Sequence, residues 1–214
     1  MTKHKILAVR HITDSTFVVR FEREGIAFRA GQYLFLGREG TLEQKEYSIY
    51  SSEEDPYLEV LVRAVDEGLV SKDLQSCRPG DLLESDGPFG SFLLDDLARQ
   101  TSNYVFVATG TGISPFHSFV RTYSDLNYVV LHGVRFGTEA YDRERYGTDS
   151  YVLCTSRDGE GDFRGRVTEF LTRAAYPDNS LFYLAGNSAM IRDAYDLLEG
   201  KGIANSRIHT EVYY

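Results

Sequence analysis

The sequence is poor in the residues that would build a metal centre, a disulfide framework or a membrane span. It has only two cysteines, Cys77 and Cys154, which lie far apart and form no CxxC pair. We therefore expect no disulfide framework, no iron–sulfur or zinc centre and no other metal site. No apolar run approaches the ~20 residues that a membrane-spanning helix needs. No apolar segment follows residues 1–5 as in a secretory signal. These features favour a cytoplasmic protein.

Positive charge is also scarce. The chain has 23 Lys and Arg against 32 Asp and Glu, a formal net charge of −9. Nonspecific nucleic-acid binding needs a basic stripe, and none is evident, so this class of function is excluded. A hydrophobic content of 42% and an aromatic content of 13% are those of a folded protein. The 214 residues are enough for one large domain or two of about a hundred residues each.

The first half of the chain shows the alternation of β-strands. The alternating apolar residues are Phe17, Val19 and Phe21, and then Leu58, Val60, Val62 and Ala64. Glycine and Pro-Gly turns recur between Gly25 and Gly87, and no helical pattern of any length is evident. We predict a small antiparallel β-barrel.

In the second half, apolar strands alternate with helical patterns. Strand-like runs lie at 104–108, 128–132, 150–154, 181–185 and 207–214. The helical patterns consist of Val167, Phe170, Leu171 and Ala174, and of Met190, Ala194, Leu197 and Leu198. This alternation predicts a doubly wound α/β domain with a parallel sheet. Because residues 95–103 are polar, we place the barrel domain at 1–97 and the α/β domain at 98–214.

A glycine-rich turn joins the strand-like run 104–107 to a helical pattern of Phe116, Phe119, Val120 and Tyr123. Strand, glycine turn and helix leave unpaired backbone N–H groups and a positive dipole end facing an anion. Gly110 and Gly112 allow a tight turn and close approach of a phosphate, and Pro115 suits the first helical turn. Pro115 replaces the third glycine of the usual dinucleotide fingerprint. By itself the stretch fits either a nucleotide site or a tight structural turn.

Seven local motifs, taken in order along the chain, resemble the ferredoxin–NADP reductase family. They are Gly31-Gln32-Tyr33, Tyr47-Ser48-Ile49-Tyr50-Ser51, Gly68-Leu69-Val70-Ser71, Gly87-Pro88-Phe89-Gly90, Gly110-Thr111-Gly112-Ile113-Ser114-Pro115, Gly186-Asn187-Ser188-Ala189-Met190 and Glu211-Val212-Tyr213-Tyr214. The resemblance implies a bacterial-type reductase with FAD on the barrel and NADPH on the α/β domain. It further implies electron transfer between NADPH and ferredoxin or flavodoxin. The choice of FAD over FMN rests on the resemblance.

The resemblance also implies which residues hold the flavin. Lys45 stands where the family has an arginine on the flavin phosphates, and it keeps the charge without the bidentate fork. Tyr47 corresponds to a residue stacked near the flavin ring, and Ser48 to one that faces the reactive N5. The expected FAD-binding residues are Lys45, Tyr47, Ser48, Ile49, Gly68, Leu69, Val70, Ser71, Tyr213 and Tyr214.

The expected catalytic residues are Ser48, Glu211 and Tyr213. Tyr213 resembles the terminal aromatic that covers the flavin where the nicotinamide must arrive. Glu211 corresponds to a carboxylate that orients and stabilises charge near the nicotinamide. Tyr214 is expected over the adenine side of the flavin or the domain cleft. Ala185 departs from the family, which often has a cysteine at this position.

Arginines near strand ends favour NADP over NAD, because a site selective for the 2′-phosphate binds it with paired guanidinium groups. Arg135, Arg157 and Arg166 resemble the arginines of the bacterial reductases, and Ser156 adds a hydroxyl. The expected NADP-binding residues are Thr109, Gly110, Thr111, Gly112, Pro115, Arg135, Ser156, Arg157, Arg166, Gly186, Asn187 and Met190.

Two other functions stay open. The same scaffold serves NAD(P)H:flavin reductases and the reductase components of multicomponent oxygenases, although this chain lacks the C-x4-C-x2-C iron–sulfur module. A non-catalytic regulatory subunit that binds flavin or nucleotide is the second alternative, suggested by Lys45 and Ala185. For a reductase, we expect a monomer that docks an acidic carrier through basic residues. The candidates are Lys3, Lys5, Arg10, Arg29 and Lys45.

Overall fold

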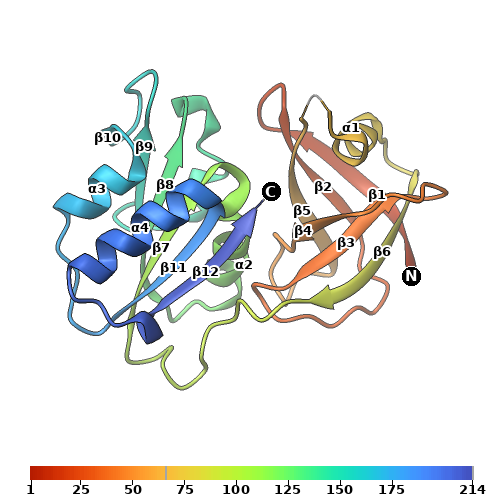
Figure 1. Cartoon of the computed structure of the whole chain (residues 1–214). Helices are drawn as coiled ribbons and strands as arrows, with labels where there is room; N and C mark the ends of the chain where they lie inside the picture. Colours follow the sequence, from red (N-terminus) through yellow and green to blue (C-terminus); the bar gives the residue numbers. More distant parts are fainter. Residues whose placement is uncertain (66, 214) are drawn as a thin grey trace. The chain divides into compact units, whose positions relative to one another are not determined.

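The structure is a computed structural model that describes residues 1–65 and 67–213. Its contacts divide the chain into two compact units, shown with their strands and helices in Figure 1. Unit 1 contains Met1–Leu93 together with His117–Thr122. Unit 2 contains Leu94–Phe116 and the chain from Tyr123 onward. The sequence placed a boundary between residues 97 and 98, whereas the contacts place it after Leu93 and also assign the end of one helix to unit 1.

Unit 1 is an antiparallel barrel, as predicted. Within the described residues its six strands follow the order β4-β3-β6-β1-β2-β5. Their bounds are β1 Thr2–His11, β2 Thr16–Glu22, β3 Tyr33–Arg38, β4 Lys45–Ser48, β5 Tyr57–Arg63 and β6 Leu82–Phe89. An antiparallel bridge between Ile49, just after β4, and Val60 in β5 brings the two edges of the sheet together. The barrel is therefore nearly closed, which protects its edge strands.

The barrel core uses the alternation seen in the sequence. Phe17, Val19 and Phe21 of β2 are fully buried and pack in one cluster with the alternating apolar residues of β5. Burial of each such side chain stabilises the fold by about 1.5–3 kcal/mol relative to exposure. This core fixes the register of β2 against β5, because a slip of one residue would turn every apolar side chain outward.

The expectation of a first half without a helix is wrong. Helix α1 spans Leu69–Ser76 between β5 and β6. Its buried residues Val70, Ser71 and Leu74 lie on one face, and Val70 and Leu74 join the barrel core. The helix has few apolar residues of its own, so its amphipathic signal is weak, and packing on the barrel decides its formation.

Unit 2 is an α/β domain, as predicted. Within the described residues its parallel sheet has the order β10-β9-β8-β7-β11-β12. The strands are β7 Asn103–Thr109, β8 Asn127–Val134, β9 Tyr151–Thr155, β10 Phe163–Arg164, β11 Ser180–Asn187 and β12 Ile208–Tyr213. Helices α3 (Val167–Arg173) and α4 (Ser188–Gly200) cover one face together (Figure 1). On the other face, Phe116 at the start of α2 (Ser114–Thr122) stacks on Phe106 of β7 with ring centroids 4.8 Å apart.

The predicted helical face through Tyr123 is wrong at its end, because α2 stops at Thr122. Tyr123 instead accepts the Arg99 guanidinium over its ring, 4.5 Å from the centroid. Phe116 and Phe119 are fully buried as predicted, but His117 and Ser118 are buried as well. The helix is thus enclosed on several sides rather than on one amphipathic face.

Candidate functional site

The glycine-rich turn forms a one-turn 3-10 helix, Gly110–Ile113, that joins β7 directly to α2. Gly110 has a positive φ of 53°, a conformation that favours glycine. Gly112 is required for space, since a Cβ there would lie 2.5 Å from the carbonyl oxygen of Ala185. Because the first N–H groups of a helical segment have no partner within the helix, the turn offers backbone donors to an anion.

The late glycine motif packs against this turn. Gly186 has a φ of 124°, and a Cβ there would lie 2.5 Å from the Thr109 hydroxyl. That hydroxyl accepts the backbone N–H of Asn187 at 3.0 Å. The Asn187 side chain then caps α4 by accepting the N–H groups of Ala189 and Met190. Two motifs 78 residues apart therefore form one edge, at the carboxyl ends of the neighbouring strands β7 and β11.

The predicted arginines gather at the carboxyl ends of three neighbouring strands. Arg135 follows β8 and Arg157 follows β9, and the backbone N–H of Arg157 donates to the Arg135 carbonyl at 3.0 Å. The guanidinium carbon of Arg157 lies 5.9 Å from the centroid of Phe136. Arg166 follows β10, which pairs with β9, and occupies the N-cap of α3. All three side chains are exposed.

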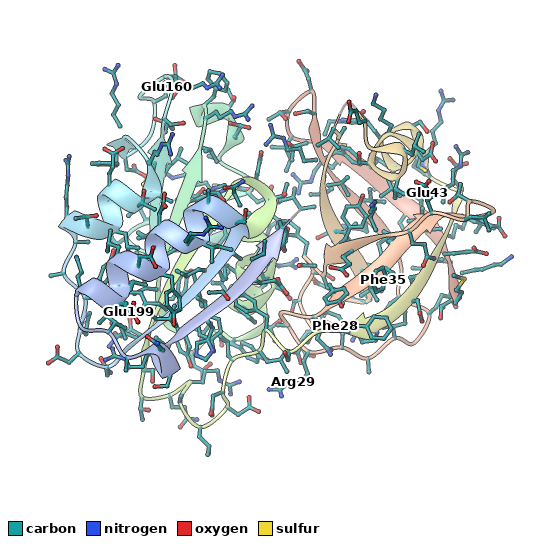
Figure 2. The ribbon with its side chains drawn as sticks, viewed as in Figure 1. Phe28, Arg29, Phe35, Glu43, Glu160 and Glu199 are labelled. Atoms are coloured by element: carbon teal, nitrogen blue, oxygen red, sulfur yellow. The ribbon has the colours of Figure 1, made fainter. Side chains whose placement is uncertain are left out.

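The Ser156 hydroxyl donates to the Val134 carbonyl at 3.2 Å, so it links β9 to β8. Two carboxylates shape the same edge. Glu139 accepts the backbone N–H groups of Arg135 and Phe136 at 2.9 and 3.0 Å. Asp158 accepts from Glu160 and from Gly137, and these backbone hydrogen bonds hold its pKa below the ordinary value. Glu160 is labelled in Figure 2 on the loop that carries Asp158. Because these two carboxylates bind backbone donors, they fold the loops around the arginines.

On the barrel, the expected flavin residues lie along β4 and just after it. Lys45 is exposed, Tyr47 is half-buried and Ser48 is buried. Burial raises the pKa of Tyr47 to about 12, so its phenol stays neutral at physiological pH. Ile49 is fully buried in the barrel core, and its backbone N–H donates to the Gln32 carbonyl at 2.9 Å, so neither the side chain nor this N–H is open to a ligand.

The N-terminus of α1 offers a second set of backbone donors. Gly68 at the N-cap has no side chain that could satisfy the N–H groups of Leu69, Val70 and Ser71. The Ser71 hydroxyl holds the preceding loop, because it accepts the Val65 N–H at 3.3 Å and donates to the Gly68 carbonyl at 3.1 Å. Contact of this hydroxyl with a phosphate stays a prediction.

Glu211 and Tyr213 lie two residues apart on β12, and therefore on one face of the sheet. Glu211 is the register partner of Ala185, and Tyr213 that of Asn187. Both side chains are half-buried. Pro115 is buried in the first turn of α2, and the Met190 side chain belongs to the core of unit 2. Tyr214 lies outside the described residues.

Two of the basic residues expected to dock a carrier, Lys3 and Lys45, lie on strands that are not neighbours. Lys3 lies on β1 and Lys45 on β4, with β6 and β3 between these strands in the sheet. Lys3 also pairs with Glu39 at 2.6 Å and lies 3.9 Å from Glu84. Other acidic residues, such as Glu43 labelled in Figure 2, share this unit. Lys3 is therefore charge-compensated by the barrel itself.

Sequence reasoning missed one polar residue next to the turn. His132 of β8 is fully buried, and its Nε2 lies 2.9 Å from the Gly110 carbonyl oxygen. Its Nδ1 lies 2.6 Å from the hydroxyl of Tyr151 in β9. A histidine inside an apolar strand was the available signal, but its partners depend on strand pairing.

Comparison with known families gives two matches. Residues 3–93 match the oxidoreductase FAD-binding domain and residues 106–196 the oxidoreductase NAD-binding domain. The flavodoxin/ferredoxin–NADP reductase of Escherichia coli K12 is 27% identical over 88% of this chain and 86% of that protein. The ferredoxin–NADP reductase of Pseudomonas aeruginosa is 34% identical over 63% of this chain, and the match spans 55% of that relative.

Solved structures share the whole fold. A ferredoxin NADP+ reductase from Neisseria gonorrhoeae, with bound FAD and NADP, has a TM-score of 0.88 and 25% identity, and the match covers 100% of this chain and 98% of that one. An Amycolatopsis cytochrome P450 reductase also has a TM-score of 0.88, with 26% identity over 99% of this chain and 69% of its own. None of the helices in the described residues has the length and apolar character to cross a membrane.

Proposed function

The chain belongs to the ferredoxin/flavodoxin–NADP reductase family, and from this membership we propose that it carries electrons between NADPH and ferredoxin or flavodoxin. At the coarser level it is an FAD-dependent NAD(P)H oxidoreductase. One observation supports the proposal most directly. The glycine turn and the three arginines stand at the carboxyl ends of neighbouring strands of one sheet, where this architecture binds dinucleotides.

The donor set of each unit fits its cofactor. In unit 2, the backbone N–H groups at the start of the 3-10 turn Gly110–Ile113 suit a pyrophosphate, and Arg135, Arg157 and Arg166 suit a 2′-phosphate. In unit 1, the start of α1 and the exposed Lys45 suit the flavin phosphates. When bound, FAD accepts a hydride from NADPH and releases single electrons to a carrier.

The chain's own residues supply binding and placement. The neutral Tyr47 offers a planar surface for stacking, and Ser48 offers a hydroxyl at the next position of β4. On unit 2, Glu211 and Tyr213 share one face at the end of β12, which lets a carboxylate and an aromatic ring act on the same part of a ligand. We assign Glu211 to orienting the nicotinamide and Tyr213 to shielding the flavin ring.

The test is anaerobic stopped-flow reduction of the purified, FAD-loaded protein by NADPH and by NADH at equal concentration. We expect the flavin band to bleach much faster with NADPH, because only NADPH carries the 2′-phosphate that the arginines bind. Equal rates would contradict the preference for NADPH. A protein that binds no flavin would contradict the reductase function as a whole and would favour the regulatory alternative.

A reductase component of an oxygenase system is the second candidate. It is favoured by relatives of that kind, such as the electron transfer component of toluate 1,2-dioxygenase from Pseudomonas putida, 24% identical over 96% of this chain. That match spans 65% of the relative. Steady-state assays with ferredoxin, flavodoxin and free flavin as acceptors separate the candidates. Turnover of free flavin without turnover of either protein carrier would favour a flavin reductase.

A further inference from the structure

A buried hydrogen-bonded chain leads from β9 through β8 to the glycine turn. Tyr151 and His132 are 4% and 0% exposed, and each contributes one link. The Tyr151 hydroxyl lies 2.6 Å from His132 Nδ1, and His132 Nε2 lies 2.9 Å from the carbonyl oxygen of Gly110. The strands β7, β8 and β9 are neighbours in the sheet, so the chain runs across three elements and ends on the turn.

The direction of each hydrogen bond follows from the chemistry of the partners. The carbonyl oxygen of Gly110 can only accept, so His132 Nε2 carries the proton and donates. Burial lowers the pKa of His132 to about 4, so the ring is neutral at physiological pH. A neutral ring protonated at Nε2 has a lone pair at Nδ1, and this lone pair accepts the proton of the Tyr151 hydroxyl.

We propose that His132 and Tyr151 are positioning residues that aim the Gly110–Thr111 peptide at the pyrophosphate of the nicotinamide dinucleotide. A trans peptide is planar, and its C=O and the following N–H point in opposite directions within that plane. Because His132 binds the Gly110 carbonyl, the Thr111 N–H points away from His132. Gly110 has a positive φ and no Cβ, so its own conformation restrains this peptide weakly. The proposal rests on the function proposed above.

The surroundings of Tyr151 hold its hydroxyl in place. The ring of Tyr146 lies 5.0 Å from the ring of Tyr151, and that of Tyr141 lies 5.5 Å from His132. Arg143 places its guanidinium carbon 5.4 Å from the Tyr151 ring centroid, and its Nη2 donates to both carboxylate oxygens of Asp162 at 2.8 Å. The segment after β8 thus encloses both positioning residues, and the peptide is held by packed side chains.

The test compares Tyr151→Phe with Tyr104→Phe. Each variant removes one buried tyrosine hydroxyl from the same sheet, but among the described residues the Tyr104 hydroxyl has no hydrogen-bond partner. Titration with ADP-ribose, which has the pyrophosphate but lacks the 2′-phosphate and the nicotinamide, measures the turn directly. For Tyr151→Phe we expect the Kd of ADP-ribose and of NADP+ to rise together by roughly 3- to 10-fold, the effect of one lost hydrogen bond. The KM for NADPH should rise by the same factor with a smaller change in kcat. Tyr104→Phe should leave all of these values unchanged.

A second measurement detects the hydrogen-bonded chain from Tyr151 through His132 to Gly110 directly. The ¹⁵N resonances of the His132 ring should show a protonated Nε2 and an unprotonated Nδ1 from pH 5.5 to 8. In Tyr151→Phe the Nδ1 resonance should move toward that of a lone pair without a hydrogen bond. A His132 protonated at Nδ1 would overturn the proposal, and so would equal affinities for ADP-ribose in wild type and Tyr151→Phe. A wild-type protein that binds neither ADP-ribose nor NADP+ would refute the proposed function, and the inference with it.

Discussion

Gly110 and Gly112 stand two residues apart in one turn, and the turn needs each of them for a different physical reason. Gly110 has a positive φ, yet no described atom lies within 4 Å of the position where its Cβ would stand. Gly112 has an ordinary φ, but its Cβ would lie 2.5 Å from a backbone oxygen and 2.6 Å from the Cα of Gly186. An alanine at 110 therefore strains the backbone locally, whereas an alanine at 112 collides with the backbone of β11.

The proposed binding of the 2′-phosphate by Arg157 can be tested with one substitution. We expect Arg157→Ala to raise the Kd of NADP+ by roughly 10- to 100-fold, as for a lost hydrogen bond to a charged group. The Kd of ADP-ribose should not change, because ADP-ribose has no 2′-phosphate. Isothermal titration at low ionic strength measures both constants. Arg145→Ala is the matched control, since it also removes one exposed arginine from unit 2. An equal loss for both ligands would contradict the assignment of Arg157.

At the scale of elements, the end of α2 is attached to the loop between β4 and β5 within unit 1. Ser118 Oγ donates to the Ser51 carbonyl at 2.7 Å. The His117 ring stacks on Tyr50 at 3.6 Å, with its Nδ1 2.7 Å from the Tyr50 carbonyl oxygen. Arg121 pairs with Asp55 at 2.9 Å and lies 3.7 Å from Glu59, a residue 5% exposed. These contacts explain why His117–Thr122 clusters with the barrel although α2 starts in unit 2.

We expect Arg121→Met to lower the free energy of unfolding by about 1–3 kcal/mol, because a buried carboxylate loses one of its cations. Arg20 stays 2.8 Å from Glu59 and limits the loss. Arg143→Met is the control, because Arg143 and Asp162 form a pair with both side chains about 40% exposed, and such surface pairs contribute about 0–1 kcal/mol. Urea unfolding followed by circular dichroism measures both variants. Equal effects would show that burial of Glu59 does not strengthen the interaction.

Across the whole molecule, histidines with lowered pKa values make the stability of both units depend on pH. Burial lowers the pKa of His4 in unit 1 and of His132 and His209 in unit 2. His4 is held by the Glu22 carbonyl at 2.8 Å and the Ser85 hydroxyl at 2.7 Å. A group whose pKa is lower in the folded state binds more protons when unfolded, so stability rises with pH in that range.

We therefore expect the free energy of unfolding to be nearly flat above pH 6.5 and to fall as the pH drops toward 4. For His132 the pKa falls from 6.5 to about 4 on folding, which corresponds to a loss of up to about 3 kcal/mol. Urea unfolding at pH 7, 6, 5 and 4.5 measures the curve. His132→Gln carries no titrating ring and should flatten the slope of unit 2 relative to wild type. An unchanged slope in this variant would contradict the contribution of His132.

Local patterns in the sequence predict some elements of the fold and miss others. Alternating apolar residues such as Phe17, Val19 and Phe21 report a buried strand face, since neighbouring residues of a strand point to opposite sides. The spacing of Gly110 and Gly112 reports a tight turn by the same local logic. Helix α1 was missed because its few apolar residues give a weak period, and its stability comes from barrel residues distant in sequence.

Short stretches of sequence are enough to specify the order of barrel and α/β unit, the glycine turn between β7 and α2, and the position of the arginines after their strands. Each of these depends on neighbours within a few residues. Other contacts form only in the folded chain. Thr109 accepts a hydrogen bond from Asn187, and Tyr151 is connected to Gly110 through His132. These contacts depend on which parallel strands become neighbours and in which register. That choice is made by burial of both sheet faces together, so no single segment of the sequence contains it.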